Sequence, residues 1–359
     1  MIKLFEKIET EKYIVIKILF IKITFKKKNE PPKSDIDTIV WWIPFKNLRN
    51  AVRNLLNTYM DLLNINNNPV NINNSIDIIE QIMKDNANIH IQEKHEKLLF
   101  YTCANEKYYP FAIIYPIFAL AFNNDALVEI GLQDYDYFYS IYKDIIEYYK
   151  KKYNDKIYYH NVKFYDNVMP NSIRFISKPH YKTKYVYIGD IDILILEDIF
   201  NFHYNNIKHN KLDFSNHKRI NINYLTGLHF IEYDKMYPIT IPENINIYEI
   251  SDEELLYYMM VNKKYKITNI TNTNRPIHGY HVSYFSRPPL RTITTKDTLA
   301  KSVPAWTIDK EIAKKYQTIR FSKEVKDIYS LIKEDMIEIR KIIQYMDLVS
   351  FYIINNHTD

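Results

Sequence analysis

Two aspartates between two apolar runs are the residues of this chain best placed to do chemistry. The segment 184–196 reads Lys-Tyr-Val-Tyr-Ile-Gly-Asp-Ile-Asp-Ile-Leu-Ile-Leu. In an extended chain, alternate residues point to the same side, so Asp190 and Asp192 are predicted to lie together while Ile191 points into the core. Two carboxylates in apolar surroundings repel each other, and a divalent cation that prefers oxygen ligands, Mn²⁺ or Mg²⁺, would remove that cost. The alternative is a surface turn with both aspartates solvated, which the flanking apolar runs argue against.

The glycines mark further candidate positions, because the chain is rich in Ile, Asn, Lys and Tyr, as in proteins of AT-rich genomes, and has only four Gly. Gly189 directly precedes the aspartate pair and allows a ligand or another backbone to come close. Gly227 lies before His229 in Leu-Thr-Gly-Leu-His-Phe, where a substrate sugar could meet the sheet, or where another strand simply begins. Gly279 lies among histidines, and Gly131 ends a strand pattern.

A late histidine segment could complete a metal site. Residues 275–288 place His278 and His281 three apart on either side of Gly279, with arginines at both ends of the segment. Imidazole nitrogen is a good ligand for Mn²⁺, and Arg287 could neutralise a phosphate. The alternative is a loop whose histidines only satisfy backbone groups. The pairing with the aspartates favours the metal site.

Candidate acids, bases and nucleotide contacts lie elsewhere in the chain. Asp252 and Glu253 follow Ser251 and are candidate general bases, with His229 as a third; the alternative for the acids is an ordinary capped helix start. The segment 101–105 ends the first predicted strand of the sheet, where a nucleotide base and ribose would bind. Its candidate contact residues are Thr102, Cys103 and Asn105.

The elements that must position these residues alternate between strand and helix. Alternation of this kind predicts an α/β fold with a largely parallel sheet and a ligand site beyond the carboxyl ends of the strands. We expect strands at 98–103, 126–130, 157–164 and 184–188, and helices at 110–122, 136–153, 252–261 and 323–343.

Composition excludes several classes of protein. The chain has 359 residues, 47% hydrophobic and 25% charged, with one cysteine, which excludes an intrachain disulfide and a cysteine-based zinc site and fits a reducing cytoplasm. No apolar run is long enough to cross a bilayer. The net charge of +5 arises within residues 1–34, which carry nine lysines and four glutamates. The remaining chain is electrically balanced, which argues against a nucleic-acid partner.

The first 75 residues are predicted to form a basic extension. Alternating apolar residues over 13–25 indicate a strand or short hairpin, and 44–62 indicates an amphipathic helix with basic side chains. This helix either lies on an anionic membrane surface or packs on the body. The segment 64–74 is rich in asparagine and is predicted to be a linker.

Taken together, these features resemble the GT-A glycosyltransferases, most closely the glycogenin and lipopolysaccharide-galactosyltransferase type. The resemblance rests on the Asp190–Asp192 motif, on Ser-Ile-Arg-Phe with Arg174 before it, and on His278-Gly279 as the late loop. The family loop ends in Lys-Pro, whereas this chain has Arg287-Pro and a second histidine, so either His278 or His281 could be the metal ligand. Trp-Trp-Ile-Pro at 41–44 is similar to an element of glycosyltransferases from bacterial surface-polysaccharide loci.

The resemblance implies a GT-A-like, Rossmann-like mixed sheet flanked by helices in residues 95–290, with a partly helical C-terminal region over 291–359. It implies a metal-dependent transfer of sugar from a nucleotide diphosphate, a UDP-sugar above all, usually with retention of configuration. An inverting reaction would need a base near the acceptor, for which Asp252, Glu253 and His229 are the candidates. The acceptor would be a lipooligosaccharide, capsule or glycolipid, and the enzyme would lie in the cytoplasm, at the periphery of the inner membrane. The predicted donor and phosphate contacts are Thr102, Cys103, Asn105, Arg174, Gly189, Asp190, Gly227, Gly279 and Arg287, and the predicted metal ligands are Asp190, Asp192, His278 and His281.

Two other functions fit the same residues. A metal-dependent phosphoryl hydrolase or nuclease could use the aspartates, although it would need further carboxylates for two metals and a basic body for a polyanion. A non-catalytic interaction protein could use the 33 tyrosines as a binding face.

Overall fold

The computed structural model describes residues 5–9, 13–18, 21–26, 69–219, 222–243, 245–267, 278–282 and 309–356. The chain forms two compact units, residues 1–71 and residues 72–359. In the first unit, β1 (Phe5–Glu9), β2 (Tyr13–Ile18) and β3 (Ile21–Lys26) form an antiparallel sheet with β2 in the centre. The predicted strand or hairpin over 13–25 is therefore confirmed. The predicted amphipathic helix over 44–62 lies outside the described residues.

The second unit is built on a six-stranded mixed sheet in the order β11-β12-β9-β5-β6-β7. The four strands β9, β5, β6 and β7 are parallel, and β12 and β11 continue the sheet antiparallel. The parallel strands are buried on both faces, which is why they read as apolar runs. The predicted α/β class, with a largely parallel sheet flanked by helices, is confirmed. The strands are β5 (Leu98–Ala104), β6 (Ala126–Leu132), β7 (Ile157–Asn161), β9 (Tyr185–Ile188), β11 (Phe214–Ser215) and β12 (His229–Glu232).

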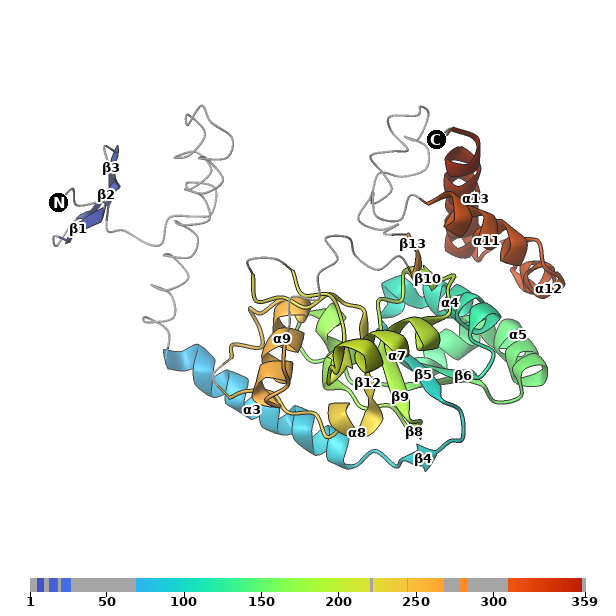
Figure 1. Cartoon of the computed structure of the whole chain (residues 1–359), viewed down its shortest axis with the longest axis horizontal. Helices are drawn as coiled ribbons and strands as arrows, with labels where there is room; N and C mark the ends of the chain where they lie inside the picture. Colours follow the sequence, from blue (N-terminus) through green and yellow to red (C-terminus); the bar gives the residue numbers. More distant parts are fainter. Residues whose placement is uncertain are drawn as a thin grey trace. The chain divides into compact units, whose positions relative to one another are not determined.

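Helices cover both faces of this sheet (Figure 1). On one face, α4 (Tyr109–Phe122) and α5 (Tyr135–Tyr153) pack on even-numbered side chains of β5 such as Phe100, with α7 (Ile199–Asn210) beside them. The other face carries α3 (Pro69–Ala87), α6 (Ile173–Ile176), α8 (Tyr233–Met236) and α9 (Asp252–Asn262). Because α3 begins at Pro69, the predicted linker over 64–74 is wrong for its last residues.

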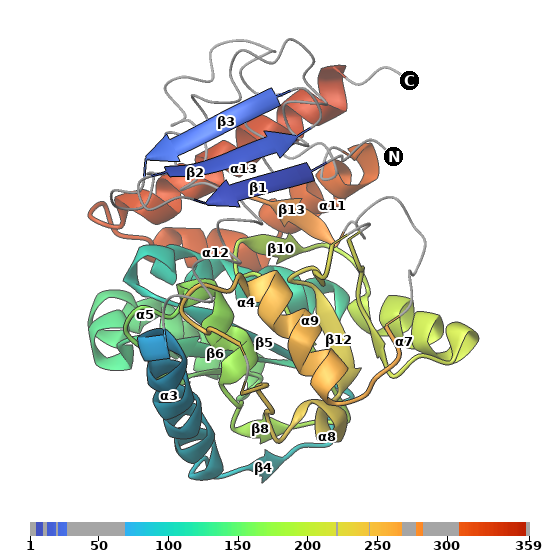
Figure 2. The ribbon, with the colours of Figure 1, turned by 90° about the vertical axis from the view of Figure 1, so that its left-hand side faces the viewer.

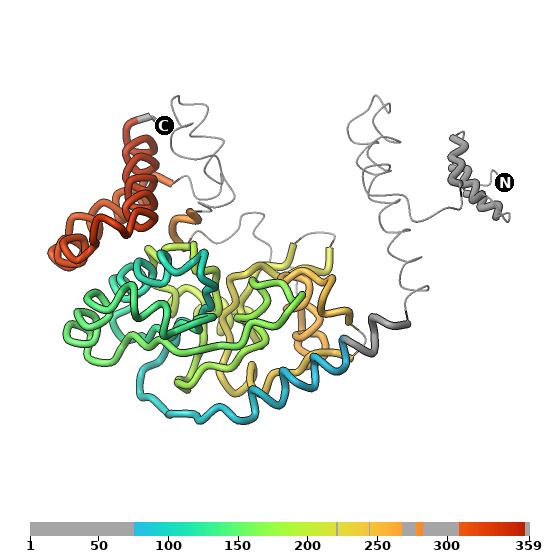
Figure 3. Tube along the Cα trace, turned by 180° about the vertical axis from the view of Figure 1, so that it is seen from behind, coloured from blue at the N-terminus to red at the C-terminus, as the bar shows by residue number. Residues whose placement is uncertain are grey.

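The C-terminal helices share the core of the sheet. The helix α4 is buried along nearly its whole length, since it lies between the sheet and α13 (Ile337–Asn356). The ring of Phe118 stacks on Tyr316 of α11 (Lys310–Arg320), with centroids 5.7 Å apart. Figures 2 and 3 show these red helices beside the teal and green segment 98–153.

The helix predicted over 323–343 is interrupted. The chain forms α12 (Lys323–Leu331), leaves the helical conformation at Ile332, and starts α13 at Ile337. Both Ile332 and Met336 are buried in the core, so the break lets two short apolar faces pack at different angles. The sequence analysis also missed α3, α7 and α11. No helix among the described residues is long and apolar enough to cross a bilayer.

Candidate functional site

The aspartate pair lies at a turn beyond the carboxyl end of β9. The backbone N–H of Ile193 donates to the carbonyl of Asp190 at 3.2 Å, so the chain is not extended through the motif as predicted. Ile191 is buried, as expected. The side chains of Asp190 and Asp192 are only 28% and 14% exposed, so they are not the solvated residues of a surface turn.

Arg174 joins the pair to a third carboxylate. Its Nη2 lies 2.7 Å from Asp190 Oδ1 and 2.7 Å from Asp252 Oδ2, and its Nη1 donates to the carbonyl of Asn171 at 2.6 Å. The side chain of Arg174 is 5% exposed, and its guanidinium lies over the ring of Phe175. Asp252 is the first residue of α9, which Figure 1 shows in orange.

Opposing effects act on the pKa of Asp190. Burial raises the pKa of this carboxyl, Arg174 lowers it, and the negative charges of Asp192 and Asp252 raise it again. The net direction is upward, because desolvation is the largest effect.

Gly227 lies against Arg174 and Asp190, just before the antiparallel strand β12. A Cβ at this position would lie 2.7 Å from Arg174 Nη2 and 2.8 Å from Asp190 Oδ2, so only glycine lets the backbone come this close. Asn216 holds the segment in place, accepting from the N–H of Thr226 at 2.9 Å and donating to its carbonyl at 2.8 Å. The predicted site residues Arg174, Asp190 and Gly227 are thus in contact.

The structure separates the two candidate histidines. The strand β13 (Gly279–His281) pairs antiparallel with β10 (Ile193–Ile195), opposing His281 to Ile193 just after the aspartate turn. His281 Nε2 consequently lies 3.6 Å from Asp192 Oδ2. Gly279 permits this pairing, because a Cβ there would lie 1.6 Å from the carbonyl oxygen of Leu194.

His278 is placed elsewhere. Its Nε2 lies 3.0 Å from Nε2 of His203, its Nδ1 lies 3.8 Å from a carboxylate oxygen of Glu197, and the residue is 1% exposed. Burial lowers the pKa of His278, which keeps the ring neutral in this setting. The structure therefore brings His281, and not His278, to the aspartates. Arg287 lies outside the described residues.

The other candidate bases differ in accessibility. His229 has no exposed surface, and burial lowers its pKa to about 3, so it is a buried neutral ring without access to solvent. Its Nδ1 lies 3.3 Å from the Asn216 amide nitrogen. Glu253 accepts from Arg219 Nη2 at 2.7 Å at the start of α9. The Ser251 hydroxyl caps that helix by accepting from the N–H of Glu254, as the alternative for these acids predicted.

The end of β5 places its three predicted contacts differently. Thr102 is fully buried, and Cys103 packs against Gly131 with its Sγ 3.5 Å from Ser177 Oγ. Burial raises the pKa of the Cys103 thiol to about 11, so it is protonated at neutral pH. Asn105 lines a pocket.

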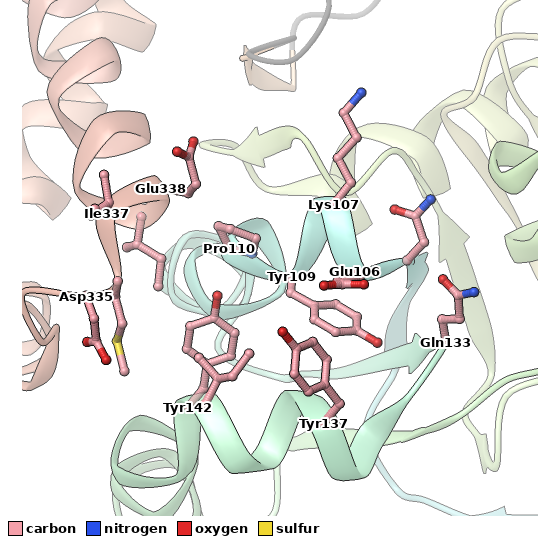
Figure 4. Close-up of a pocket in the computed structure, with 14 residues that line it drawn as sticks. Glu106, Lys107, Tyr109, Pro110, Gln133, Tyr137, Tyr142, Asp335, Ile337 and Glu338 are labelled. Carbon is pink, nitrogen blue, oxygen red and sulfur yellow. The ribbon is translucent and has the colours of Figure 1, made fainter.

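That pocket has a volume of about 630 Å³ and lies at the carboxyl ends of β5 and β6, the same edge of the sheet as the aspartates. Figure 4 shows the rings of Tyr109, Tyr137 and Tyr142 along it, with Gln133 at one end and the start of α13 at the other.

Three residues at the site were not predicted from the sequence: Tyr108, Arg219 and Asn216. Burial and the negative charges of Asp192 and Asp190 raise the pKa of Tyr108 to about 12. The signal in the sequence was its position four residues after the end of β5 at Ala104, close to the predicted contact Asn105. Nothing in the sequence pointed to Arg219 or Asn216, because their partners are distant in the chain.

The comparisons with known proteins add little. No protein-family model and no curated protein matches the chain. Among solved structures, the chain is similar to S. aureus TarS, a glycosyltransferase, with a TM-score of 0.34 and 11% sequence identity. The match covers 73% of this chain and 55% of that chain, so this chain spans about half the length of TarS. A similarity of this size does not determine a function.

Proposed function

We propose that this protein is a metal-dependent glycosyltransferase that moves a sugar from a nucleotide diphosphate, a UDP-sugar above all, to a surface glycan. The observation that carries the proposal is the position of Asp190 and Asp192. They are partly buried at the carboxyl edge of a parallel sheet, and a strand from far along the chain brings His281 beside them. In open α/β sheets this edge is where ligands bind.

The residues present fit a divalent cation. Asp190 and Asp252 pair with Arg174, and Glu253 pairs with Arg219. Asp192 adds a fourth carboxylate, so the ionised acids exceed the two guanidinium groups by two negative charges. The ligand atoms of one ion with bonds of about 2.1 Å lie about 3 Å apart. In this structure the ligand atoms of Asp190, Asp192 and His281 do not all lie within 4.8 Å of one another. To hold one ion, Asp190 would have to turn away from Arg174, and the 3.6 Å between His281 and Asp192 would have to shorten.

In the proposed reaction the protein mainly positions charge. A bound Mn²⁺ or Mg²⁺ would act as a Lewis acid on the departing diphosphate. Arg174 would gain a phosphate oxygen as a partner when Asp190 turns to the ion, while Asp252 keeps the guanidinium in place. Retention of configuration needs no protein base. If the reaction inverts, Asp252 or Glu253 would take the proton of the acceptor hydroxyl, because His229 is buried.

The pairing of the acids favours a transferase over a two-metal phosphoryl hydrolase. Asp252 and Glu253 each form an ion pair with an arginine at 2.7 Å, so they are committed to guanidinium groups and are not grouped around a second ion. An interaction protein would not need a buried arginine between two acids at the ligand-binding edge of its sheet.

A thermal-shift screen of nucleotide diphosphates with and without Mn²⁺ tests the proposal. We expect a small rise in melting temperature with Mn²⁺ alone and a larger rise with Mn²⁺ and a uridine diphosphate nucleotide. Asp190→Asn and Asp192→Asn should remove the larger rise, and the exposed Asp125→Asn should keep it. No shift with any common diphosphate nucleotide would contradict the proposal.

We further propose that the basic residues 1–34 bind the anionic inner-membrane surface, where a glycan acceptor carried on lipid would be found. Full-length protein and a form without residues 1–63 would be compared in sedimentation with anionic vesicles. The shortened form should lose vesicle binding and keep nucleotide binding. Equal vesicle binding by both forms would contradict the membrane role.

A further inference from the structure

A second cluster of ligand-type side chains lies away from the aspartates, between β6, β7 and the segment before β8 (Tyr181–Lys182). Glu129 Oε1 lies 3.0 Å from His160 Nε2 and 3.3 Å from His180 Nδ1. In the described part of the chain, these three residues are the one group of His, Cys, Asp or Glu whose ligand atoms all lie within 4.8 Å of one another.

We propose that Glu129, His160 and His180 form a structural site for one divalent transition-metal ion, Zn²⁺ first. Two imidazoles and one carboxylate are a ligand set that proteins use for zinc. Ligands bound to zinc at about 2.1 Å in tetrahedral geometry lie about 3.4 Å apart. The separations of 3.0 and 3.3 Å are close to that value.

The orientation of His160 favours an ion over a proton between the two groups. The Nε2 atom is buried and has no hydrogen-bond partner of acceptable geometry, although it lies 3.0 Å from the carboxylate of Glu129. Its other nitrogen, Nδ1, lies 3.1 Å from the carbonyl of Asn161 and can donate to it. A neutral ring protonated at Nδ1 presents the lone pair of Nε2 to the carboxylate, an arrangement that a bound cation stabilises.

Hydrogen bonds hold the carboxylate of Glu129 in one orientation, as they would hold a metal ligand. Glu129 is fully buried, its Oε1 accepts from the backbone N–H of His180 at 2.6 Å, and its Oε2 accepts from the N–H of Tyr181 at 2.9 Å. These bonds fix the carboxylate while leaving lone-pair positions for an ion. Tyr158 packs against both rings, with centroids 5.6 Å from His160 and 5.7 Å from His180.

The site would join three segments distant in sequence. Glu129 lies on β6, His160 on the edge strand β7, and His180 four residues after α6, the helix that carries Arg174. His180 is 28% exposed, so an ion has a route in and a fourth position for water. An ion here would fix the segment from which Arg174 reaches the aspartates.

The test uses the full-length protein, depleted of metal with EDTA and titrated with Zn²⁺ or with Co²⁺. We expect about one Zn²⁺ per chain by elemental analysis after dialysis, and a visible Co²⁺ absorption band that Zn²⁺ displaces. His180→Ala, at the most exposed of the three positions, should weaken Zn²⁺ binding by about tenfold or more.

Two controls separate this site from others. His209→Ala removes an exposed histidine outside the cluster, and Asp192→Asn removes a ligand of the proposed active site; both should keep the Co²⁺ band. Wild-type protein that binds no stoichiometric Zn²⁺ and gives no displaceable band would overturn the site. Equal loss of the band in His209→Ala and His180→Ala would overturn it as well, because it would show surface binding.

Discussion

Replacing Arg174 by methionine tests the electrostatic account of the site most directly. Methionine replaces the apolar stem of the arginine by an unbranched apolar side chain, but it lacks the guanidinium over Phe175 and removes the positive charge between Asp190 and Asp252. The two carboxylate oxygens each lie 2.7 Å from the same guanidinium nitrogen, so they are at most about 5.4 Å apart. Without the arginine, two like charges remain at that separation in a partly buried site.

The expected loss follows from Coulomb's law. At an effective dielectric constant of about 20, two unit charges no more than about 5.4 Å apart repel each other by at least about 3 kcal/mol, and in the variant no positive charge offsets this repulsion. This agrees with the range of about 3–5 kcal/mol for removing one partner of a buried ion pair. We therefore expect Arg174→Met to lower the free energy of unfolding by about 3 kcal/mol at pH 7.5, or the melting temperature by roughly 6 °C.

The loss of stability caused by Arg174→Met should depend on pH in a defined direction. Burial already raises the pKa of Asp190, and removing Arg174 takes away the largest effect that lowers it, so the pKa in the variant rises further. A carboxyl with a raised pKa in the folded state favours folding when protonated, and this contribution is lost as the pH rises through that pKa. The difference in free energy of unfolding between wild type and Arg174→Met should therefore be largest at pH 7.5 and should decrease as the pH falls.

The assay is urea denaturation followed by far-ultraviolet circular dichroism between pH 7.5 and 5. The matched control is Arg219→Met, because Arg219 pairs with Glu253 and its side chain is 40% exposed. Arg219→Met should lower the free energy of unfolding by no more than about 1 kcal/mol. If Arg174→Met does not fold, Arg174→Lys keeps the charge and should show a smaller loss. The reasoning would be refuted if Arg174→Met lowered the free energy of unfolding no more than Arg219→Met does. It would also be refuted if the effect of Arg174→Met stayed constant between pH 7.5 and 5.

Three further outcomes are expected. Gly279→Ala should lower the free energy of unfolding by about 2–3 kcal/mol, measured by urea denaturation, because its Cβ would collide with the carbonyl of Leu194; a neutral effect would show that β13 can move freely. Cys103 should react slowly with iodoacetamide at pH 7.5 and much faster toward pH 11, followed by mass spectrometry, because burial raises its thiol pKa to about 11; fast reaction at pH 7.5 would contradict that environment. If the proposed transfer retains configuration, Glu253→Gln should change the rate with a UDP-sugar less than tenfold; a loss of about 100-fold or more would indicate that Glu253 is the base of an inverting reaction.

Local sequence determined most elements of the sheet. The runs from Leu98, Ala126 and Lys184 are too apolar for a solvated chain, and helical patterns separate them, so an α/β sheet follows from burial alone. The same reasoning predicted the aspartate pair, because burying a charged residue within an apolar run is unfavourable in free energy unless an ion or an opposite charge pairs with it.

The helix boundaries show where local pattern was insufficient. Nothing in the sequence of 323–343 breaks the helical pattern with Pro or Gly, and the interruption at Ile332 follows from packing of α12 and α13 on the core around α4. The amphipathic α11 was missed for a related reason, since its partner Phe118 is almost 200 residues away. Helices that form by packing are visible only when their partners are known.

The sequence by itself determined which residues could do chemistry, and the tertiary structure decided which of them meet. Arg174 and Asp252 lie 78 residues apart, and no spacing rule joins them. Antiparallel pairing of β13 with β10 selects His281 over His278, because side chains three positions apart on an extended chain point to opposite faces. Glu129, His160 and His180 carry no motif at all. Side-chain chemistry is local, but the proximity that makes a site depends on contacts between segments that only the folded chain brings together.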